Sequence, residues 1–302
     1  MKNIKQIVLV GAEGFLGKNL GNFLHSQGYE IIGIDIQKAQ SNLKYKSFIQ
    51  KNILDLTLED MPFLNTDDDY GLIHVGGVSR NGVAAKFPVE SSSNTLTSLV
   101  KLLELLEVKP PKWMALTSTR EVEILLEDKE SIKAKQRIYP TLKLATELIA
   151  ESYQGHWKIP LKIFRLSDIF GGGDHPSKVM QIFLNKAIKN EDINVMEPEV
   201  KLFLTEVKEV SNIIYKSIND NENTKSELIN IWDKEYFISL LELAYLAKEL
   251  NPNSTSKIIA PECAELNYSI LKKLTPNHSK EISSLNQSLI KMNNEKQALQ
   301  NH

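Results

Sequence analysis

The sequence has little of what would indicate metal, disulfide or membrane chemistry. Its one cysteine, Cys263, excludes an internal disulfide and a zinc site built from cysteines. No two of its six histidines stand at the spacing of helical metal ligands, so no metal is expected. No window approaches the ~20 apolar residues of a membrane span. The apolar run at residues 7–12 is too short for a signal peptide. A cytoplasmic protein that does not contact membranes is therefore expected.

An excess of either charge is also absent. The 36 basic and 38 acidic residues give a net charge of −2, which argues against a dedicated nucleic-acid binder and a polybasic membrane anchor. Hydrophobic residues make up 42% of the chain and charged residues 25%, as in globular proteins. A length of 302 residues allows two domains with sizeable cores.

What the sequence does contain is an alternation of strand-like and helix-like segments. Strands are expected at residues 6–10, 30–34, 48–53, 72–75, 113–116 and 161–166, and helices at 15–27, 94–106 and 142–153. Such alternation predicts an α/β fold with a doubly wound parallel sheet covered by helices on both faces. After Gly171 the pattern loosens, with helices expected at 179–187, 210–218 and 240–250. The predicted organisation is a large domain at 1–170, a smaller lobe at 171–275 with some elements returning to the large domain, and a polar helical tail at 276–302.

The tail carries a thin heptad stripe, made of Ile282, Leu285, Leu289, Met292 and Leu299. The stripe covers less than three heptads. A terminal helix that docks on the body is therefore favoured over self-association.

The sharpest local pattern is a glycine-rich turn between the first strand and the first helix. Gly11, Gly14 and Gly17 follow the spacing GxxGxxG. Without side chains at these positions, a phosphate can approach the free N–H groups at the helix N-terminus. Asp35 ends the second strand, where a carboxylate accepts hydrogen bonds from both ribose hydroxyls and repels a 2′-phosphate. The two features together predict NAD rather than NADP.

A second pattern pairs Tyr139 with Lys143, four residues later. Residues four apart share a helix face, so the ammonium would lie near the phenol, favour the phenolate and lower the pKa of the tyrosine. The pair would supply a general base or acid that works near neutrality. Pro140 fits if the helix begins there, because proline suits the first turn.

Together these motifs resemble the extended short-chain dehydrogenase/reductase family, the NAD-dependent nucleotide-sugar epimerases and dehydratases. The resemblance covers roughly residues 6–260 and rests on motifs in the family's order: residues 8–20 (VLVGAEGFLGKNL), 33–35 (GID), 74–79 (HVGGVS), 116–122 (LTSTREV) and 165–173 (RLSDIFGGG). It implies a Rossmann-type fold, with NAD bound by the large domain and substrate by the smaller C-terminal lobe. It also implies a homodimer through the helix that follows Asn94 and the helix of Tyr139.

Residue by residue, the resemblance implies three kinds of site. The catalytic positions are Thr119, Tyr139 and Lys143. The NAD contacts would be Gly11, Gly14, Phe15, Leu16, Gly17, Asp35, Asn52, Ile53, Val75, Gly76, Gly77 and Asn94, together with Tyr139 and Lys143. The substrate contacts would be Ser79, Arg80, Arg120, Glu121, Asp168 and Lys178.

The sequence departs from the family's pattern at several positions. Asn52 stands where an aspartate usually faces the adenine, although its amide oxygen still accepts hydrogen bonds. Glu123 and Ile124 replace a Tyr-Gly pair. Asp168 replaces an asparagine that commonly meets the substrate diphosphate, and a carboxylate there repels phosphate unless it is paired.

The reaction implied is epimerisation of a nucleotide-sugar through a transient keto intermediate, with Tyr139 as the base. A 4,6-dehydratase would place an acidic pair after the threonine, where this chain has Arg120 and Glu121. Arginine is a poor proton donor, so epimerisation is favoured. A 4,6-dehydratase, an NAD-linked reductase and a catalytically silent NAD-binding scaffold or sensor remain as alternatives.

Overall fold

The computed structural model describes residues 4–40, 42–220, 225–232, 237–261, 291–294 and 298. The chain divides into two compact units. The first comprises Met1–Leu166 and Lys208–Ile231, and the second comprises Ser167–Val207 and Trp232–His302. Each unit has its own apolar core.

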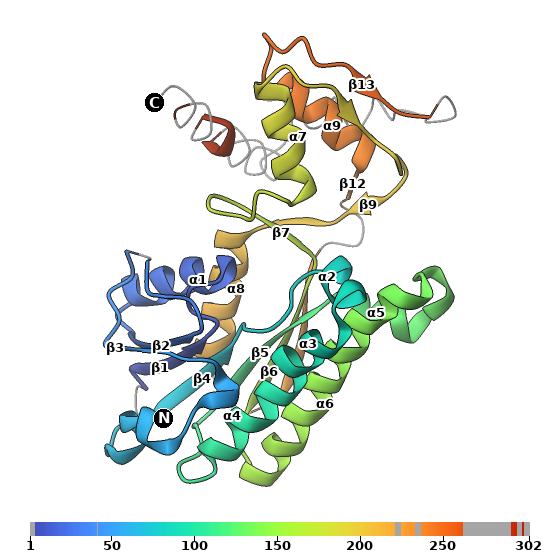
Figure 1. Ribbon diagram of the computed structural model, residues 1–302. Helices are drawn as coiled ribbons and strands as arrows, with labels where there is room; N and C mark the ends of the chain where they lie inside the picture. The colour runs from blue at the N-terminus through green and yellow to red at the C-terminus, as the bar shows by residue number, and fades with distance from the viewer. Residues whose placement is uncertain are drawn as a thin grey trace. The chain divides into compact units, whose positions relative to one another are not determined.

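The first unit is built on a seven-stranded sheet in the order β11-β6-β5-β4-β1-β2-β3 (Figure 1). Every neighbouring pair in it is parallel, which confirms the predicted doubly wound sheet. Its strands are β1 Gln6–Val10, β2 Glu30–Asp35, β3 Ser47–Gln50, β4 Tyr70–His74, β5 Met114–Thr119, β6 Leu161–Leu166 and β11 Glu227–Ile231. The chain winds outward in opposite directions from β1, since β2 lies on one side of it and β4 on the other. In open α/β sheets, ligands bind at the carboxyl ends of the strands where the winding reverses.

Helices cover both faces of this sheet (Figure 1). Helices α3, α4 and α6 lie on one face, and α1 and α8 lie on the other. The helices of the unit are α1 Phe15–Ser26, α2 Asn81–Lys86, α3 Pro88–Ser92, α4 Ser98–Leu106, α5 Glu121–Glu127, α6 Ile138–Trp157 and α8 Val207–Asn219. The four leucines of α4 that are fully buried (Leu99, Leu102, Leu103 and Leu106) pack into the core beside β1, β4 and β5.

Several elements differ in their bounds from the sequence-based expectation, as α6 does at both ends, and two also differ in their local structure. The helix expected at 94–106 begins earlier, and a π-helical turn at Ser93–Thr97 separates α3 from α4. The strand expected at 48–53 ends at Gln50, because the Asn52 side chain accepts the N–H of Leu54 (3.1 Å) and starts a 3-10 turn at Ile53–Asp55. Further 3-10 turns lie at Leu58–Asp60, Pro62–Asn65, Lys129–Ser131 and Ala134–Arg137.

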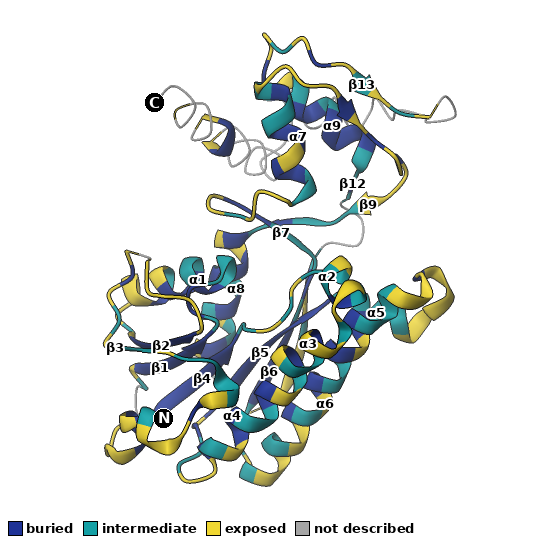
Figure 2. Ribbon diagram, in the orientation of Figure 1, coloured by how far each residue is buried: buried dark blue, intermediate teal, exposed yellow. Residues whose placement is uncertain are grey.

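The second unit contains helices α7 Val179–Ile188 and α9 Leu240–Glu249, which pack against each other. Three short strand pairs accompany them: β7 Asp168–Phe170 with β10 Leu204–Glu206, β9 Lys201–Leu202 with β12 Ile238–Ser239, and β8 Ile193–Asn194 with β13 Ile258–Ile259. The inward faces of α7 and α9 are buried, as Figure 2 shows. Ser239 and Glu242 form a capping box at the start of α9, which satisfies two otherwise unpaired N–H groups.

Most of the predicted heptad stripe in the tail lies outside the described residues. Of its members, Met292 is described, and it is buried in the core of the second unit. Asn293 donates from its amide nitrogen to the carbonyl of Leu250 (3.1 Å). The described part of the tail thus contacts the second unit of its own chain, and the helical tail as a whole stays a prediction.

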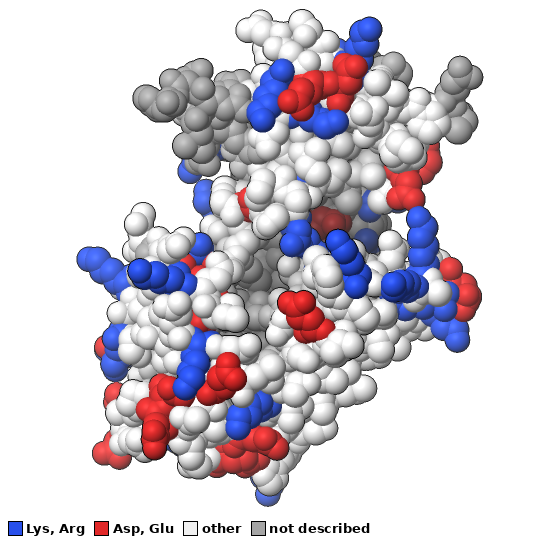
Figure 3. Space-filling view, in the orientation of Figure 1, with Lys and Arg blue, Asp and Glu red and all other residues white. Residues whose placement is uncertain are grey.

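Acidic and basic side chains are interspersed on the face of the molecule shown in Figure 3, as the nearly balanced composition predicts. In the described part of the chain, no helix combines the length and the apolar character that crossing a bilayer requires. The same residues contain no cluster of three potential metal ligands.

Candidate active site

The glycine-rich turn connects the buried strand β1 to helix α1 at the carboxyl edge of the sheet. Gly11 has φ +79°, and a Cβ there would lie 2.7 Å from the backbone of Gly76. At Gly17 a Cβ would lie 2.0 Å from the carbonyl oxygen of Gly11. Both positions therefore require glycine, one for its backbone conformation and its close neighbour, the other for the helix's approach to the turn.

The start of α1 suits an anionic group. Gly14 occupies the N-cap position without a side-chain cap, and the first turn contains no acidic residue. The N–H groups of Phe15 and Leu16 have no acceptor within the helix. An α-helical N–H bonds to the carbonyl four residues earlier, and for the first turn those residues lie outside the helix. These N–H groups and the positive end of the helix dipole fit the pyrophosphate of a dinucleotide.

Asp35, at the end of β2, holds the loops around it. Its Oδ2 accepts the N–H of Glu13 (2.8 Å) and its Oδ1 accepts the N–H of Gln37 (2.8 Å). A carboxylate offers about four lone-pair sites, so these two bonds leave room for the two ribose hydroxyls of an adenosine. The geometry fits the predicted role of Asp35.

The ends of β1 and β4 adjoin each other at this edge. Val75 donates its N–H to the carbonyl of Val10 (3.0 Å), and Gly76 follows beside Gly11. Gly77 has φ +105°, and the next N–H, that of Val78, donates to the hydroxyl of Thr95 (3.1 Å).

Two of the other predicted NAD contacts lie in backbone turns. Asn94 lies in the π-helical turn that also contains Thr95, and its carbonyl accepts the hydroxyl of Ser98 (2.8 Å). The Asn52 amide oxygen caps the turn that contains Ile53, and its contact with adenine stays a prediction.

Tyr139 and Lys143 lie one turn apart on α6, which packs against β5. Both are buried, with exposed fractions of 8% and 6%. Lys143 Nζ donates to the carbonyl of Thr117 on β5 (2.7 Å). Thr119 ends the same strand, so β5 and α6 together position all three predicted catalytic residues. Pro140 lies within the first turn of α6, where proline is tolerated, as predicted.

Burial changes the charge equilibria at this site. It lowers the pKa of Lys143 to about 8, and the neighbouring carboxylate of Glu147 partly opposes this shift. Burial and the charge of Lys143 lower the pKa of His74 to about 3, so this histidine is neutral at physiological pH. The Nε2 atom of His74 is buried without a hydrogen-bond partner among the described residues.

An ion pair between Glu147 and Arg165 lies one helical turn after Lys143 on α6. Arg165 on β6 donates from Nε to Glu147 Oε1 (3.0 Å) and from Nη2 to Glu147 Oε2 (2.7 Å). The side chains are 11% and 4% exposed, respectively. Glu147 is not among the site residues predicted from the sequence. Its position four residues after Lys143, on the same helix face, is the signal that would have found it.

The substrate residues predicted from sequence fall into both units. In the first unit, the N–H of Glu121 donates to the Thr119 hydroxyl (3.3 Å), and the Glu121 carboxylate accepts the amide of Asn81, which follows Arg80. Arg120 donates its N–H to the carbonyl of Leu166 (2.7 Å), and Ser79 lies in the segment between β4 and α2.

The second unit contains the remaining two. Asp168 accepts the N–H of Phe203 through Oδ2 (3.1 Å), and Lys178 is the N-cap residue of α7. Their contacts with substrate stay predictions.

Residues 7–231 match the family described as the NAD dependent epimerase/dehydratase family. The chain belongs to this family. The match spans the glycine-rich turn, Asp35, and the strand and helix that carry Thr119, Tyr139 and Lys143, so it confirms the resemblance recognised from the sequence.

Individual relatives of this family member are distant. It is 26% identical over 219 residues to a dTDP-D-glucose 4,6-dehydratase of Dictyostelium discoideum. The aligned region covers 64% of this chain and 50% of that protein. It is 20% identical over 205 residues to the "Probable UDP-glucuronate 4-epimerase" of Rhizobium meliloti (strain 1021). Here the aligned region covers 62% of this chain and 60% of that protein. The chain thus spans half to three fifths of the length of these curated relatives.

A solved structure shows the same fold. It is a UDP-N-acetylglucosamine 4-epimerase from Methanobrevibacter ruminantium M1 in complex with UDP-N-acetylmuramic acid, with a TM-score of 0.76 and 16% sequence identity, covering 99% of each chain. The likeness confirms the Rossmann-type α/β fold.

Proposed function

We propose that this chain is an NAD-dependent epimerase that acts on a nucleotide-sugar through a transient keto intermediate. The observation that carries the proposal is the joint placement of Thr119, Tyr139 and Lys143 by β5 and α6, at the sheet edge that also carries the glycine-rich turn. Bound NAD supplies the hydride acceptor and donor. The turn and Asp35 would hold its pyrophosphate and its ribose.

In this proposal the protein's own groups move and hold a proton. The phenol oxygen of Tyr139 takes the proton of a sugar hydroxyl, and the hydroxyl of Thr119 donates a hydrogen bond to the same sugar oxygen. Lys143 is fixed on the Thr117 carbonyl, and with a pKa of about 8 it is mostly charged at neutral pH. A charge held close to the phenol would favour the phenolate.

The choice between epimerase and dehydratase depends on the residues after Thr119. A dehydratase needs an acid to protonate the departing hydroxyl, and Arg120 is a poor proton donor. Glu121 is present as a base, and one relative carries the name of a dehydratase. Epimerisation needs no added acid, since the keto sugar has only to turn over and be reduced on its other face. We therefore place the epimerase first and the 4,6-dehydratase second.

The proposal extends to the remaining parts of the chain. Residues 171–275 would bind the sugar-nucleotide, with Asp168 and Lys178 near its diphosphate. The active form would be a homodimer. The α4 leucines are buried in the core of their own chain, whereas Leu148 of α6 is exposed and would be available to such an interface. Light scattering on the purified protein measures the mass directly.

The test is a product analysis on a panel of UDP-, dTDP- and GDP-sugars. An epimerase gives a product of unchanged mass with an inverted centre seen by NMR, whereas a dehydratase gives a product lighter by one water. Tyr139→Phe is expected to abolish turnover and to retain NAD, as measured by mass spectrometry of the denatured protein. Tyr153→Phe, a partly buried tyrosine on the same helix, is the matched control and should remain active. Unchanged turnover in Tyr139→Phe contradicts the mechanism.

A further inference from the structure

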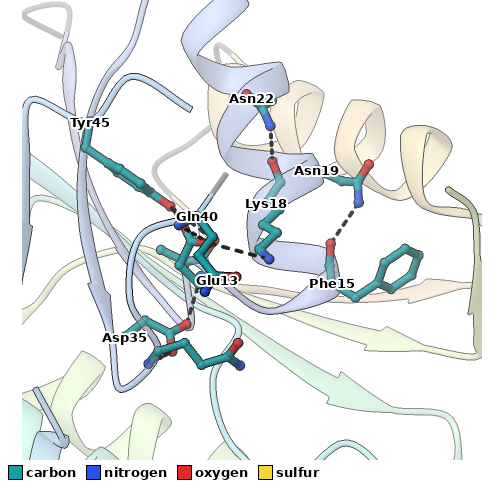
Figure 4. A network of polar contacts seen from close by, with 10 residues as sticks. Glu13, Phe15, Lys18, Asn19, Asn22, Asp35, Gln40 and Tyr45 are labelled. Carbon is teal, nitrogen blue, oxygen red and sulfur yellow. Dashed lines mark hydrogen bonds and ion pairs between the residues drawn. The ribbon is translucent and has the colours of Figure 1, made fainter. Parts of the chain in front are cut away.

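A carboxylate is buried inside the glycine-rich turn, where the chain has Glu13 between Gly11 and Gly14. Its side chain is 0% exposed. Oε1 accepts the hydroxyl of Tyr45 (2.7 Å), and Oε2 accepts the N–H of Gln40 (3.2 Å) and lies 3.5 Å from Lys18 Nζ (Figure 4). Burying a carboxylate is costly unless it is paired and hydrogen-bonded, and Glu13 has both kinds of partner.

The backbone of Glu13 is joined to the carboxylate expected to bind ribose. The N–H of Glu13 donates to Oδ2 of Asp35 (Figure 4). The N–H of Gln37 donates to Oδ1 of the same carboxylate. The segment that follows Asp35 then returns to Glu13 through the N–H of Gln40. Two fixed carboxylates therefore share one network at the ribose end of the cofactor site.

The network places two carboxylates, those of Glu13 and Asp35, at one end of the site, and Lys18 Nζ lies beside Glu13. The Lys18 side chain is 37% exposed, so solvent weakens its effect more than it weakens that of the buried Glu13. Two carboxylates held at this end of the site oppose the approach of a further anion.

We propose that Glu13 is a specificity-determining residue, which acts with Asp35 to reject a dinucleotide that carries a 2′-phosphate. The ribose 2′-hydroxyl of NAD is a neutral donor that a carboxylate accepts. A 2′-phosphate carries about −1.5 to −2 charges near pH 7 and is repelled by both acids. Glu13 has a second effect, because its bonds to Tyr45 and Gln40 fix the loop after β2 against the turn. The inference rests on the proposed binding of NAD.

The test separates the charge of Glu13 from its hydrogen bonds. Calorimetry measures the Kd values of NAD⁺ and NADP⁺ for wild type, Glu13→Gln, Tyr45→Phe and Lys18→Met. Glutamine keeps the shape and satisfies the same partners if the tyrosine hydroxyl rotates to accept. We expect Glu13→Gln to lower the NADP⁺/NAD⁺ ratio of Kd values about tenfold, which is ~1.4 kcal/mol.

The two companion variants are expected to change the NADP⁺/NAD⁺ ratio of Kd values in the opposite direction or to leave it unchanged. Lys18→Met leaves Glu13 without its cation and should raise the ratio. Tyr45→Phe removes one hydrogen bond and no charge, so it should leave the ratio unchanged even if it weakens both nucleotides. Circular dichroism checks that each variant is folded.

Three results would overturn the inference. Equal changes of both Kd values in Glu13→Gln would show that the residue only holds the loop. A lower ratio in Lys18→Met would show that removing this cation favours NADP⁺, the opposite of what repulsion by Glu13 predicts. A folded wild-type protein that binds neither nucleotide would refute the proposed function itself and remove the premise, an outcome distinct from the other two.

Discussion

The contact between α1 and the glycine-rich turn predicts that Gly17 tolerates no side chain. A Cβ there would lie 2.0 Å from the carbonyl oxygen of Gly11 and 2.9 Å from two backbone atoms of Ala12. Backbone atoms cannot rotate away as a side chain can, so Gly17→Ala must displace the start of α1. Overpacking of this kind costs about 1–3 kcal/mol or more.

Gly155 provides a matched control for this substitution. It lies within α6, and a Cβ there meets nothing within 4 Å. Replacement of an unobstructed helical glycine by alanine stabilises by about 0.5–1 kcal/mol. The free energies of unfolding of Gly17→Ala and Gly155→Ala should therefore differ by at least about 1.5 kcal/mol. Gly28, with φ +92° and no neighbour within 4 Å of its Cβ, isolates the backbone strain, and Gly28→Ala should cost about 1 kcal/mol.

The assay is thermal unfolding followed by circular dichroism, with NAD⁺ binding measured by calorimetry on the same samples. A difference of 1 kcal/mol shifts the melting temperature of a domain of 150–250 residues by about 2–4 °C, so the expected separation is several degrees. Gly17→Ala should also lose NAD⁺ affinity, because the N–H groups of the first turn move. If Gly17→Ala melts together with Gly155→Ala and binds NAD⁺ like wild type, the steric argument is wrong.

Three further predictions concern buried charges. Glu147→Gln strands the Arg165 guanidinium and should destabilise by about 3–5 kcal/mol in urea denaturation, whereas a double Met variant at both positions should regain most of this loss. Burial lowers the pKa of Lys143 from 10.5 to about 8, so the unfolded chain binds more protons between these values. Stability without cofactor should therefore rise with pH from 8 to 10.5 by up to about 3 kcal/mol, a rise that Lys143→Met should lack. Burial, aided by Lys143, lowers the pKa of His74 from 6.5 to about 3, so stability should fall as pH decreases through this window, and less steeply in His74→Gln. Equal pH profiles for variant and wild type would contradict either assignment.

Much of the cofactor half was predictable because its determinants are local. A strand buried on both faces reads as a continuous apolar run, and β1 and β4 were found that way. The glycine-rich turn and Asp35 follow their strands directly in the sequence. The spacing of Tyr139 and Lys143 places them on one face of any helix that contains them.

The contacts between distant segments were not predictable in this way. No local pattern indicates that the Glu13 side chain is buried against Tyr45, or that Glu147 pairs with Arg165 across two elements. The ends of strands were also not predictable where a side chain accepts a backbone N–H that would otherwise pair with a neighbouring strand. Asn52 does this after β3, where its amide oxygen accepts the N–H of Leu54.

By itself, the sequence determined the α/β class and the turn that suits a dinucleotide, because periodicity and spacing encode both of them within a few turns or strands. The candidate catalytic residues came from the resemblance of its motifs to a known family. The sequence predicted that some elements of the second half return to the large domain, but only the tertiary structure identified β11 as the strand that pairs with β6 at the edge of the sheet. The tertiary structure also brought Glu13 and Asp35 into one network and buried Lys143 deeply enough to lower its pKa. Burial and pairing between distant segments depend on which surfaces the whole chain removes from water, and no short stretch of sequence contains that information.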